Sequence, residues 1–110
     1  MKKYLFLDDE RIPKDVTWIR IDKNAPWQIV RSYQEAVDWV EQNGFPNVIS
    51  LDHDLGNVYS GMDFAKWLVN YDLDTNTMPD DFTYTVHSMN PEGKRNIDRY
   101  IHDYLRVKEN

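Results

Sequence analysis

Two short, continuous apolar runs that both end in acid constrain the fold of this chain more than any other feature. The runs cover residues 4–7 and 48–51. The first leads into Asp8, Asp9 and Glu10, and the second into Asp52, His53 and Asp54. A continuous apolar pattern, rather than an alternating one, is typical of strands covered on both faces. We therefore expect two buried strands that deliver carboxylates at the same end of a sheet.

The segment between the two runs predicts a strand and a helix. Residues 28–31 favour a short strand, and residues 33–43 favour a helix that ends at Gly44. A second helix is expected after Ser60, which can form a capping box with Asp63. Connections of this length join parallel strands, whereas antiparallel neighbours need only a tight turn. The pattern therefore predicts a mainly parallel sheet.

The last third of the chain predicts one more strand and one more helix. Residues 82–86 alternate apolar and polar side chains, as expected of a strand near the edge of the sheet. Asn90 suits the N-cap and Pro91 the first position of a final helix. Residues 11–27 show no helical pattern, and we expect an extended insert there. The acid-rich stretch 72–76 lacks the glycine of an EF-hand loop, and we expect it to be a solvated loop.

Length, charge and composition exclude several classes of protein. The 110 residues suit a single domain over 1–110. A net charge of −6 gives no broad attraction to a nucleic-acid backbone, so sequence-specific DNA binding is not expected. The absence of cysteine excludes disulfides and thiolate metal sites. The first apolar run is too short for a signal peptide or a membrane span, and we expect a cytoplasmic protein with no membrane attachment.

The clustered acids indicate a metal site. If the strands at 4–7 and 48–51 are neighbours, their carboxylates repel one another unless a cation or shared protons relieve the repulsion. Mg²⁺ prefers oxygen ligands and is commonly shared between carboxylates and a substrate phosphate. We therefore predict a Mg²⁺ or Mn²⁺ cofactor. Its candidate ligands are Asp8, Asp9, Glu10, Asp52 and Asp54.

Groups that bind phosphate or move protons lie close to these acids in the sequence. We expect unpaired backbone N–H groups near Gly93 and Lys94, at the start of the last helix, to bind phosphate. The full candidate phosphate-binding set is Ser88, Asn90, Gly93, Lys94 and Arg95. His87 lies between a strand end and a helix start, which favours general acid–base work. For His53, proton transfer and a purely structural role are equally consistent with the sequence.

The order of these motifs resembles response-regulator receiver domains. The strings Leu-Asp-Asp-Glu-Arg-Ile-Pro at 7–13, Ser-Leu-Asp-His-Asp-Leu-Gly at 50–56 and Val-His-Ser-Met-Asn-Pro-Glu-Gly at 86–93 are closely similar to the receiver-like family named for cyclic-phosphate processing, of bacteriophages and bacteria. The resemblance implies a three-layer, flavodoxin-like α/β domain. Unlike receivers, this chain has an extended insert in place of the first helix. It also has no residues left for the fifth strand, which ends in lysine in receivers.

The resemblance also implies roles for individual residues. In receivers the acids after the first strand and the aspartate after the third bind Mg²⁺, and the latter accepts a phosphoryl group. By position these are Asp8, Asp9 and Asp52, with Asp54 contributing its backbone carbonyl. For the cyclic-phosphate family the implied catalytic residues are Asp52, His53, His87 and Arg11, with Arg11 neutralising charge in the transition state.

Two functions from different classes follow. The first is a metal-assisted phosphoesterase, a hydrolase that acts on a small phosphorylated substrate such as the cyclic phosphate of a nucleotide or of an RNA end. With two histidines, a metal-free acid–base mechanism stays open. If the chain is phage-encoded, it would act in the host cytoplasm. The second is a non-catalytic regulatory module, derived from a receiver, that binds a protein partner. The missing lysine strand argues against a phosphorylation switch.

Overall fold

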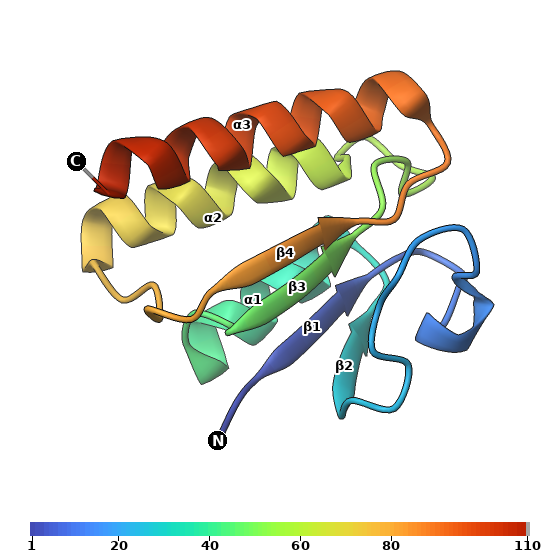
Figure 1. The fold of residues 1–110 in the computed structure, drawn as a ribbon, viewed down its shortest axis with the longest axis horizontal. Helices are drawn as coiled ribbons and strands as arrows, with labels where there is room; N and C mark the ends of the chain where they lie inside the picture. The colour runs from blue at the N-terminus through green and yellow to red at the C-terminus, as the bar shows by residue number, and fades with distance from the viewer. Residues whose placement is uncertain (110) are drawn as a thin grey trace.

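The computed structural model describes residues 1–109 and contains four strands, three α-helices and one 3-10 helix (Figure 1). In chain order the elements are β1 (Tyr4–Leu7), η1 (Pro13–Asp15), β2 (Trp27–Val30), α1 (Tyr33–Asn43), β3 (Val48–Leu51), α2 (Gly61–Thr75), β4 (Thr83–Val86) and α3 (Pro91–Glu109). Every strand and helix predicted from the sequence is present, with bounds that differ by a residue at most for the strands. The fold is a small α/β domain.

The sheet is parallel throughout, with strand order β2-β1-β3-β4. The prediction of parallel pairing is confirmed, and β4 lies at an edge as its alternating pattern indicated. β1 and β3 are direct neighbours, with Leu7 opposite Leu51 in the register. Asp8 and Asp52 therefore leave the sheet side by side.

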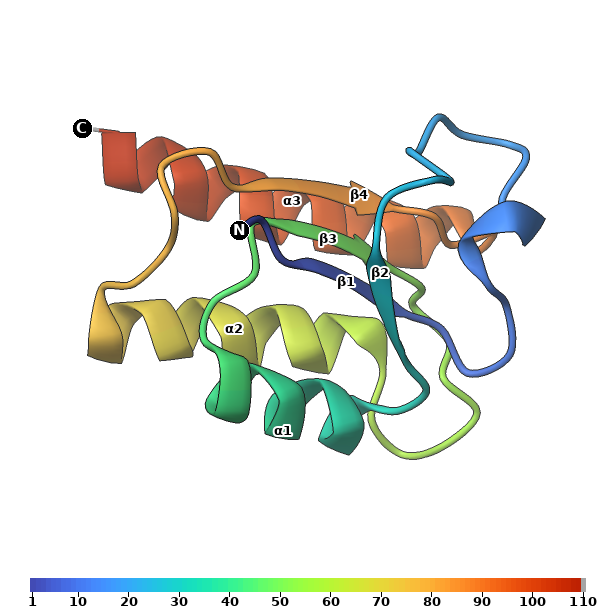
Figure 2. The same cartoon turned by 90° about the horizontal axis from the view of Figure 1, so that it is seen from below.

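The two faces of the sheet are covered in different ways. Helices α1 and α2 lie on one face, and α3 packs along α2 and beside β4 (Figures 1 and 2). Leu5 and Leu7 join the hydrophobic core on the helical side, whereas Phe6 points the other way, as strand geometry requires. The other face is covered near the carboxyl ends of the strands by the connection 8–26, with Val16 fully buried.

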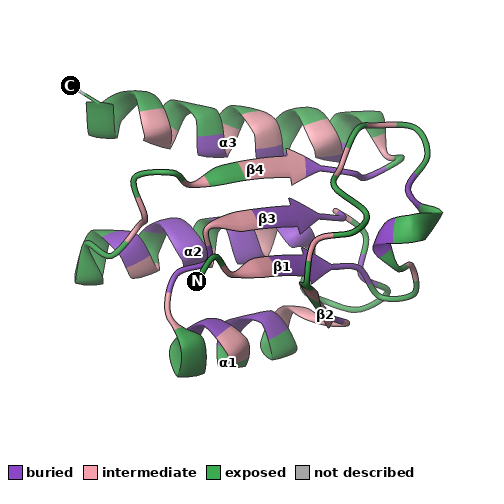
Figure 3. Ribbon diagram, turned by 60° about the horizontal axis from the view of Figure 1, so that its bottom comes forward, coloured by how far each residue is buried: buried purple, intermediate pink, exposed green. Residues whose placement is uncertain are grey.

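This connection confirms the insert that the sequence predicted in place of a first helix. Its one regular turn in the described structure is the three-residue helix η1, which the sequence did not predict. Pro13 at its first position fixes the backbone angle that the turn needs. The three layers are thus helices, sheet and connection. Burial is deepest toward the carboxyl ends of β1, β3 and β4, where the connection closes over them (Figure 3).

Local capping signals set the helix ends as predicted. The Ser32 hydroxyl accepts from the Glu35 N–H at the start of α1, and Gly44 ends that helix with a φ of 91°, a conformation that favours glycine. Ser60 and Asp63 form the expected capping box of α2. No helix within residues 1–109 has the length and apolar character to cross a bilayer.

The prediction of a solvated loop at 72–76 is wrong. Helix α2 continues to Thr75, and Asp72 is buried with 1% of its surface exposed. One Asp72 oxygen accepts from the Met78 N–H at 2.8 Å, and the other accepts from Tyr104 Oη and Lys108 Nζ at 2.6 Å each. Two of these donors come from α3, so the reason for the burial lies in packing that the local sequence does not display. Asp72 thereby ties the end of α2 to α3.

Replacing Asp72 by Asn should lower the free energy of unfolding by about 2 kcal/mol at pH 7, because two donors lose a charged, buried acceptor. Burial raises the pKa of Asp72, but hydrogen bonds from Lys108 and Tyr104 outweigh it and lower the pKa overall. A lowered carboxyl pKa adds stability that is present above the unfolded value of about 3.9 and is lost as the pH falls through the folded value.

The difference between the wild type and Asp72→Asn in urea unfolding should therefore narrow as the pH falls below about 4. Asp74→Asn, at an exposed site two residues away on the same helix, is the matched control and should stay within about 0.5 kcal/mol of the wild type. A difference for Asp72→Asn that does not change with pH would contradict this account.

Candidate active site

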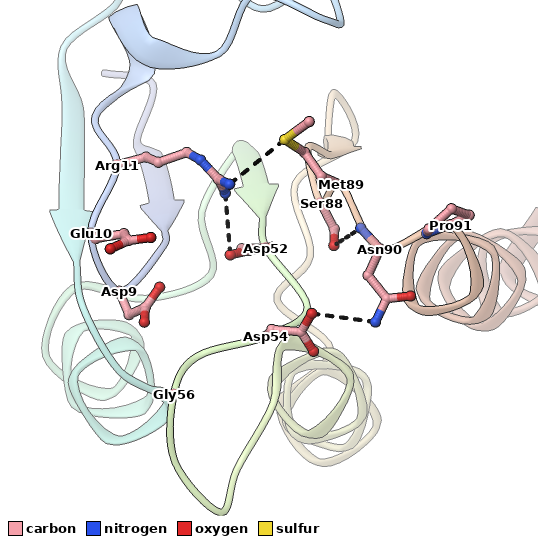
Figure 4. A pocket seen from close by; sticks show the side chains of 10 residues that line it. All are labelled: Asp9, Glu10, Arg11, Asp52, Asp54, Gly56, Ser88, Met89, Asn90 and Pro91. Atoms are coloured by element: carbon pink, nitrogen blue, oxygen red, sulfur yellow. Dashed lines mark hydrogen bonds and ion pairs between the residues drawn. The ribbon is translucent and has the colours of Figure 1, made fainter.

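Three connections meet at the carboxyl edge of the sheet and enclose an open pocket of about 560 Å³. They follow β1, β3 and β4, the strands that the sequence showed to end in polar clusters. Figure 4 shows Asp9, Glu10 and Arg11 on one side of the pocket and Ser88 and Asn90 on the other, with Asp52 and Asp54 between them. The lining residues are Asp9, Glu10, Arg11, Asp52, Asp54, Gly56, Ser88, Met89, Asn90 and Pro91.

Asp8 forms the floor of the site and is fully buried. Its Oδ1 accepts from the backbone N–H groups of Glu10 and Arg11, both at 2.9 Å. Its Oδ2 lies 3.0 Å from His87 Nε2 and 3.3 Å from Arg11 Nη1. Burial raises the pKa of Asp8, but the hydrogen bonds from His87, Arg11 and Glu10 outweigh it, and the pKa is well below its usual range. Asp8 is therefore ionised at neutral pH.

His87 lies behind Asp8 and is fully buried, and it does not line the pocket. Its Nδ1 is 2.7 Å from Ser50 Oγ, and its ring stacks on Phe6 at a centroid distance of 4.5 Å. The sequence predicted general acid–base work for this histidine. The geometry favours a different role, since a ring enclosed between Ser50 and Asp8 is placed to orient Asp8 rather than to touch a substrate.

Asp52 is 5% exposed and faces the pocket. Its Oδ1 accepts from the His53 N–H at 2.8 Å, and its Oδ2 is 3.6 Å from Arg11 Nη1. Burial and the neighbouring charge of Asp8 raise the pKa of Asp52 above its usual value. The two carboxylates therefore repel each other as the sequence predicted, and a further positive charge at this point would favour the ionised form of both.

Asp8, Asp9 and Asp52 each offer an oxygen atom, and the three atoms lie within 4.8 Å of one another. Two oxygens bound to one Mg²⁺ lie at most roughly 4.2 Å apart, twice the usual Mg–O distance. The three residues therefore supply oxygen atoms at a spacing close to what Mg²⁺ requires, and they fit a hard divalent cation. The predicted ligands Glu10 and Asp54 line the pocket but are not members of this cluster.

His53 lies at the rim of the site. Its Nδ1 is 2.9 Å from Asp54 Oδ1, and its side chain is 23% exposed. The ring packs on the start of α3 at Gly93, where a β-carbon would overlap the imidazole. Asp54 also accepts from Asn90 Nδ2 at 3.3 Å. Hydrogen bonds from His53 and Asn90 outweigh the effect of burial and lower the pKa of Asp54. Gly93 thus acts by making room for His53.

The predicted phosphate-binding residues separate into two groups. Ser88 and Asn90 line the pocket, and Ser88 Oγ accepts from the Asn90 N–H at 3.1 Å. Lys94 and Arg95 do not line it, and the Lys94 ammonium pairs with Asp98 at 2.9 Å. The expectation of unpaired N–H groups at Gly93 and Lys94 is wrong, because Asn90 accepts from both as the N-cap of α3.

Four residues that support the site were missed. Arg31 Nη1 donates to the carbonyl oxygens of Asp8 and Arg11, which fixes the turn after β1. The Trp18 indole donates to the carbonyl oxygen of His87 at 2.9 Å, and its ring lies 5.2 Å from the Arg11 guanidinium. The other two are Ser50, which contacts His87, and Met89, which contacts Arg11. Of the four, only Ser50 could have been found from the sequence, as a polar residue inside an apolar strand.

The geometry agrees with the result of comparison with known families. Residues 3–103 match the family described as "Cyclic-phosphate processing Receiver domain". The chain belongs to this family. The match covers all four strands and most of α3, and it confirms the resemblance seen in the three sequence strings. The receiver-like fold of this domain is thereby established.

The remaining comparisons concern the fold alone. No curated protein matches this receiver domain. Among solved structures, a chain described as a trimeric coiled coil of yeast Spc42 fused to another structure matches with a TM-score of 0.50 and 17% identity, over 98% of this chain and 78% of that chain. At this identity the likeness supports the arrangement of strands and helices and carries no information on activity.

The contact between α2 and Asp52 gives a test of how the site is held. A β-carbon on Gly61 would overlap the Asp52 carbonyl oxygen, so Gly61→Ala should lower the free energy of unfolding by about 1–3 kcal/mol. Lys66→Ala, at an exposed site on the same helix, should change it by less than about 0.5 kcal/mol. If urea unfolding gives the same free energy of unfolding for the two variants, α2 does not constrain Asp52.

Proposed function

We propose that this receiver domain is a metal-assisted phosphoesterase that opens a cyclic phosphate on a nucleotide or an RNA end. The observation that carries the proposal is the cluster of Asp8, Asp9 and Asp52 at a pocket whose opposite wall bears Ser88 and Asn90. Acid on one wall and hydrogen-bonding groups on the other suit a cation and a phosphate together. The name of the family agrees with a cyclic phosphate as substrate.

The reaction adds water to the phosphorus of the cyclic diester and breaks one ring P–O bond, which leaves a phosphomonoester and a free hydroxyl. Asp8, Asp9 and Asp52 would hold Mg²⁺ or Mn²⁺, which polarises the phosphoryl oxygen and lowers the pKa of a bound water. Ser88 Oγ donates to a phosphate oxygen. Arg11 neutralises charge that develops on the phosphate.

His53 moves the proton in this scheme. Of the two candidate histidines it is the one with part of its ring exposed, whereas His87 is enclosed. Its Nδ1–H donates to Asp54, which leaves Nε2 as the nitrogen that exchanges a proton with water or the leaving oxygen. Asp54 is accordingly a positioning residue for His53. His87 in turn positions Asp8.

The metal role is tested by calorimetric titration with Mn²⁺, followed by assays with 2′,3′-cyclic nucleotides in the same buffer. Asp52→Asn should lose metal binding and turnover together, because it removes a charged ligand. Asp103→Asn, which changes an exposed acid on α3 outside the cluster, should retain both. Turnover that persists in chelator would support a metal-free mechanism. A stable phosphoryl adduct on Asp52 without turnover would instead support a regulatory module that binds a protein partner.

His53→Gln should lower kcat by about 10²- to 10⁴-fold, the usual contribution of a positioned acid or base. Its affinity for Mn²⁺ should equal that of the wild type, because His53 is not in the carboxylate cluster. The pH profile of kcat should lose one limb in the variant. If kcat is unchanged while His87→Gln abolishes turnover without loss of metal binding, the assignment of the two histidines is reversed.

A further inference from the structure

The Arg11 guanidinium occupies the space between the two buried carboxylates. Its Nη1 lies 3.3 Å from Asp8 Oδ2 and 3.6 Å from Asp52 Oδ2 (Figure 4 draws the second contact). Among the lysine and arginine side chains of residues 1–109, it is the one that forms an ion pair with Asp8 or Asp52. The guanidinium therefore offsets part of the negative charge of these two acids.

The hydrogen bonds of Asp8 leave no free position for a metal ion. An ionised carboxylate accepts at about four lone-pair sites. Asp8 already accepts from two backbone N–H groups, from His87 Nε2 and from Arg11 Nη1. Coordination of a cation by Asp8 thus requires one of these four donors to leave.

Arg11 is the donor that can leave. The backbone N–H groups are fixed by the turn after β1, and His87 is fully buried between Asp8 and Ser50. The Arg11 side chain is 28% exposed, and its contacts with the carboxylates are the longest of the set. A side chain at the pocket surface moves at far lower cost than a buried ring or the backbone of a turn.

The guanidinium also contacts two groups other than the carboxylates, of which Met89 lines the pocket. The Trp18 ring lies 5.2 Å from it, and the Met89 sulfur lies 3.7 Å from Nη2. Trp18 is itself held by its hydrogen bond to the His87 carbonyl oxygen. A short movement toward Met89 would keep these contacts, free the carboxylates and turn the charged N–H groups into the pocket.

We propose that a divalent cation displaces Arg11 from Asp8 and Asp52, and that the displaced guanidinium then binds the phosphate of the substrate. The inference rests on the proposed function, since it assumes a metal and a phosphate at this site. It adds an order of binding. Without metal, Arg11 offsets the charge of the two acids. A bound metal takes over that role. Only then does the displaced Arg11 form the site that binds the phosphate.

The test compares Mn²⁺ binding to the wild type and to Arg11→Gln by calorimetry. Removal of the competitor should tighten Mn²⁺ binding by roughly 5- to 150-fold, the usual range of coupling between two ligands. Lys14→Gln removes one charge from the same connection at an exposed position and should change the affinity by less than about twofold. In the wild type a single nitrogen, Nη1, meets both carboxylates. Arg11→Lys keeps the charge on a shorter and more flexible side chain, and should fall between the wild type and Arg11→Gln.

A second measurement follows inorganic phosphate. Phosphate should bind to the Mg²⁺-saturated wild type, and binding should weaken both in chelator and in Arg11→Gln with Mg²⁺. Thermal melting controls for folding, since Arg11→Gln should melt below the wild type in chelator and approach it in saturating Mg²⁺.

The outcomes separate this inference from the proposed function. Wild-type Mn²⁺ binding that is equal to or tighter than that of Arg11→Gln overturns displacement and leaves the metal site standing. Absence of Mn²⁺ binding in all four proteins overturns both ideas. Tighter binding in Arg11→Gln, with no turnover of any cyclic ester by the wild type, supports displacement and counts against the phosphoesterase.

Discussion

The repulsion between two carboxylates on neighbouring parallel strands is the constraint on which the rest of this structure depends. The register places Leu7 opposite Leu51, so that Asp8 and Asp52 emerge together, and both are almost completely buried. Charges in such a position are tolerated only when donors surround them. The turn after β1, the buried His87 and the guanidinium of Arg11 all supply donors to this point. The donors around the site therefore serve first to stabilise two buried charges.

Comparison with receivers shows how that problem is solved in a shorter fold. Receivers have a fifth strand that ends in a lysine, whereas the sheet described for residues 1–109 has four strands and α3 lies beside β4. Here the positive charge comes from the opposite side of the site, from the connection after β1. That connection also brings Trp18 and Val16 against the sheet. The segment that stands in place of the first helix thus supplies the cation that pairs with Asp8 and Asp52.

The elements were predictable because their signals are local. A capping box spans three residues, and an apolar run of four identifies a buried strand. Adjacent strands ending in acid were enough to predict that Asp8, Asp9 and Asp52 cluster. The contacts that the sequence did not reveal are long-range: His87 meets Asp8 across 79 positions, and Asp72 meets Tyr104 and Lys108 across 32 and 36. No local pattern shows whether a histidine after a strand faces solvent or a buried carboxylate, and His87 faces the carboxylate of Asp8.

The connection between β1 and β2 is joined to the sheet by few main-chain hydrogen bonds. The strand ladder pairs β1 directly with β2 and with β3, and the carboxylates that follow β1 and β3 are fixed by that ladder. The acids that follow β1 and β3 can therefore keep their positions when the rest of the connection changes. Within this connection Trp18 contacts Arg11 and the His87 carbonyl oxygen, so a change between Lys14 and Pro26 would alter how Arg11 is held at the pocket without disturbing the strand order. The acidic centre thus belongs to the strand ladder, and the cation that faces it belongs to the connection.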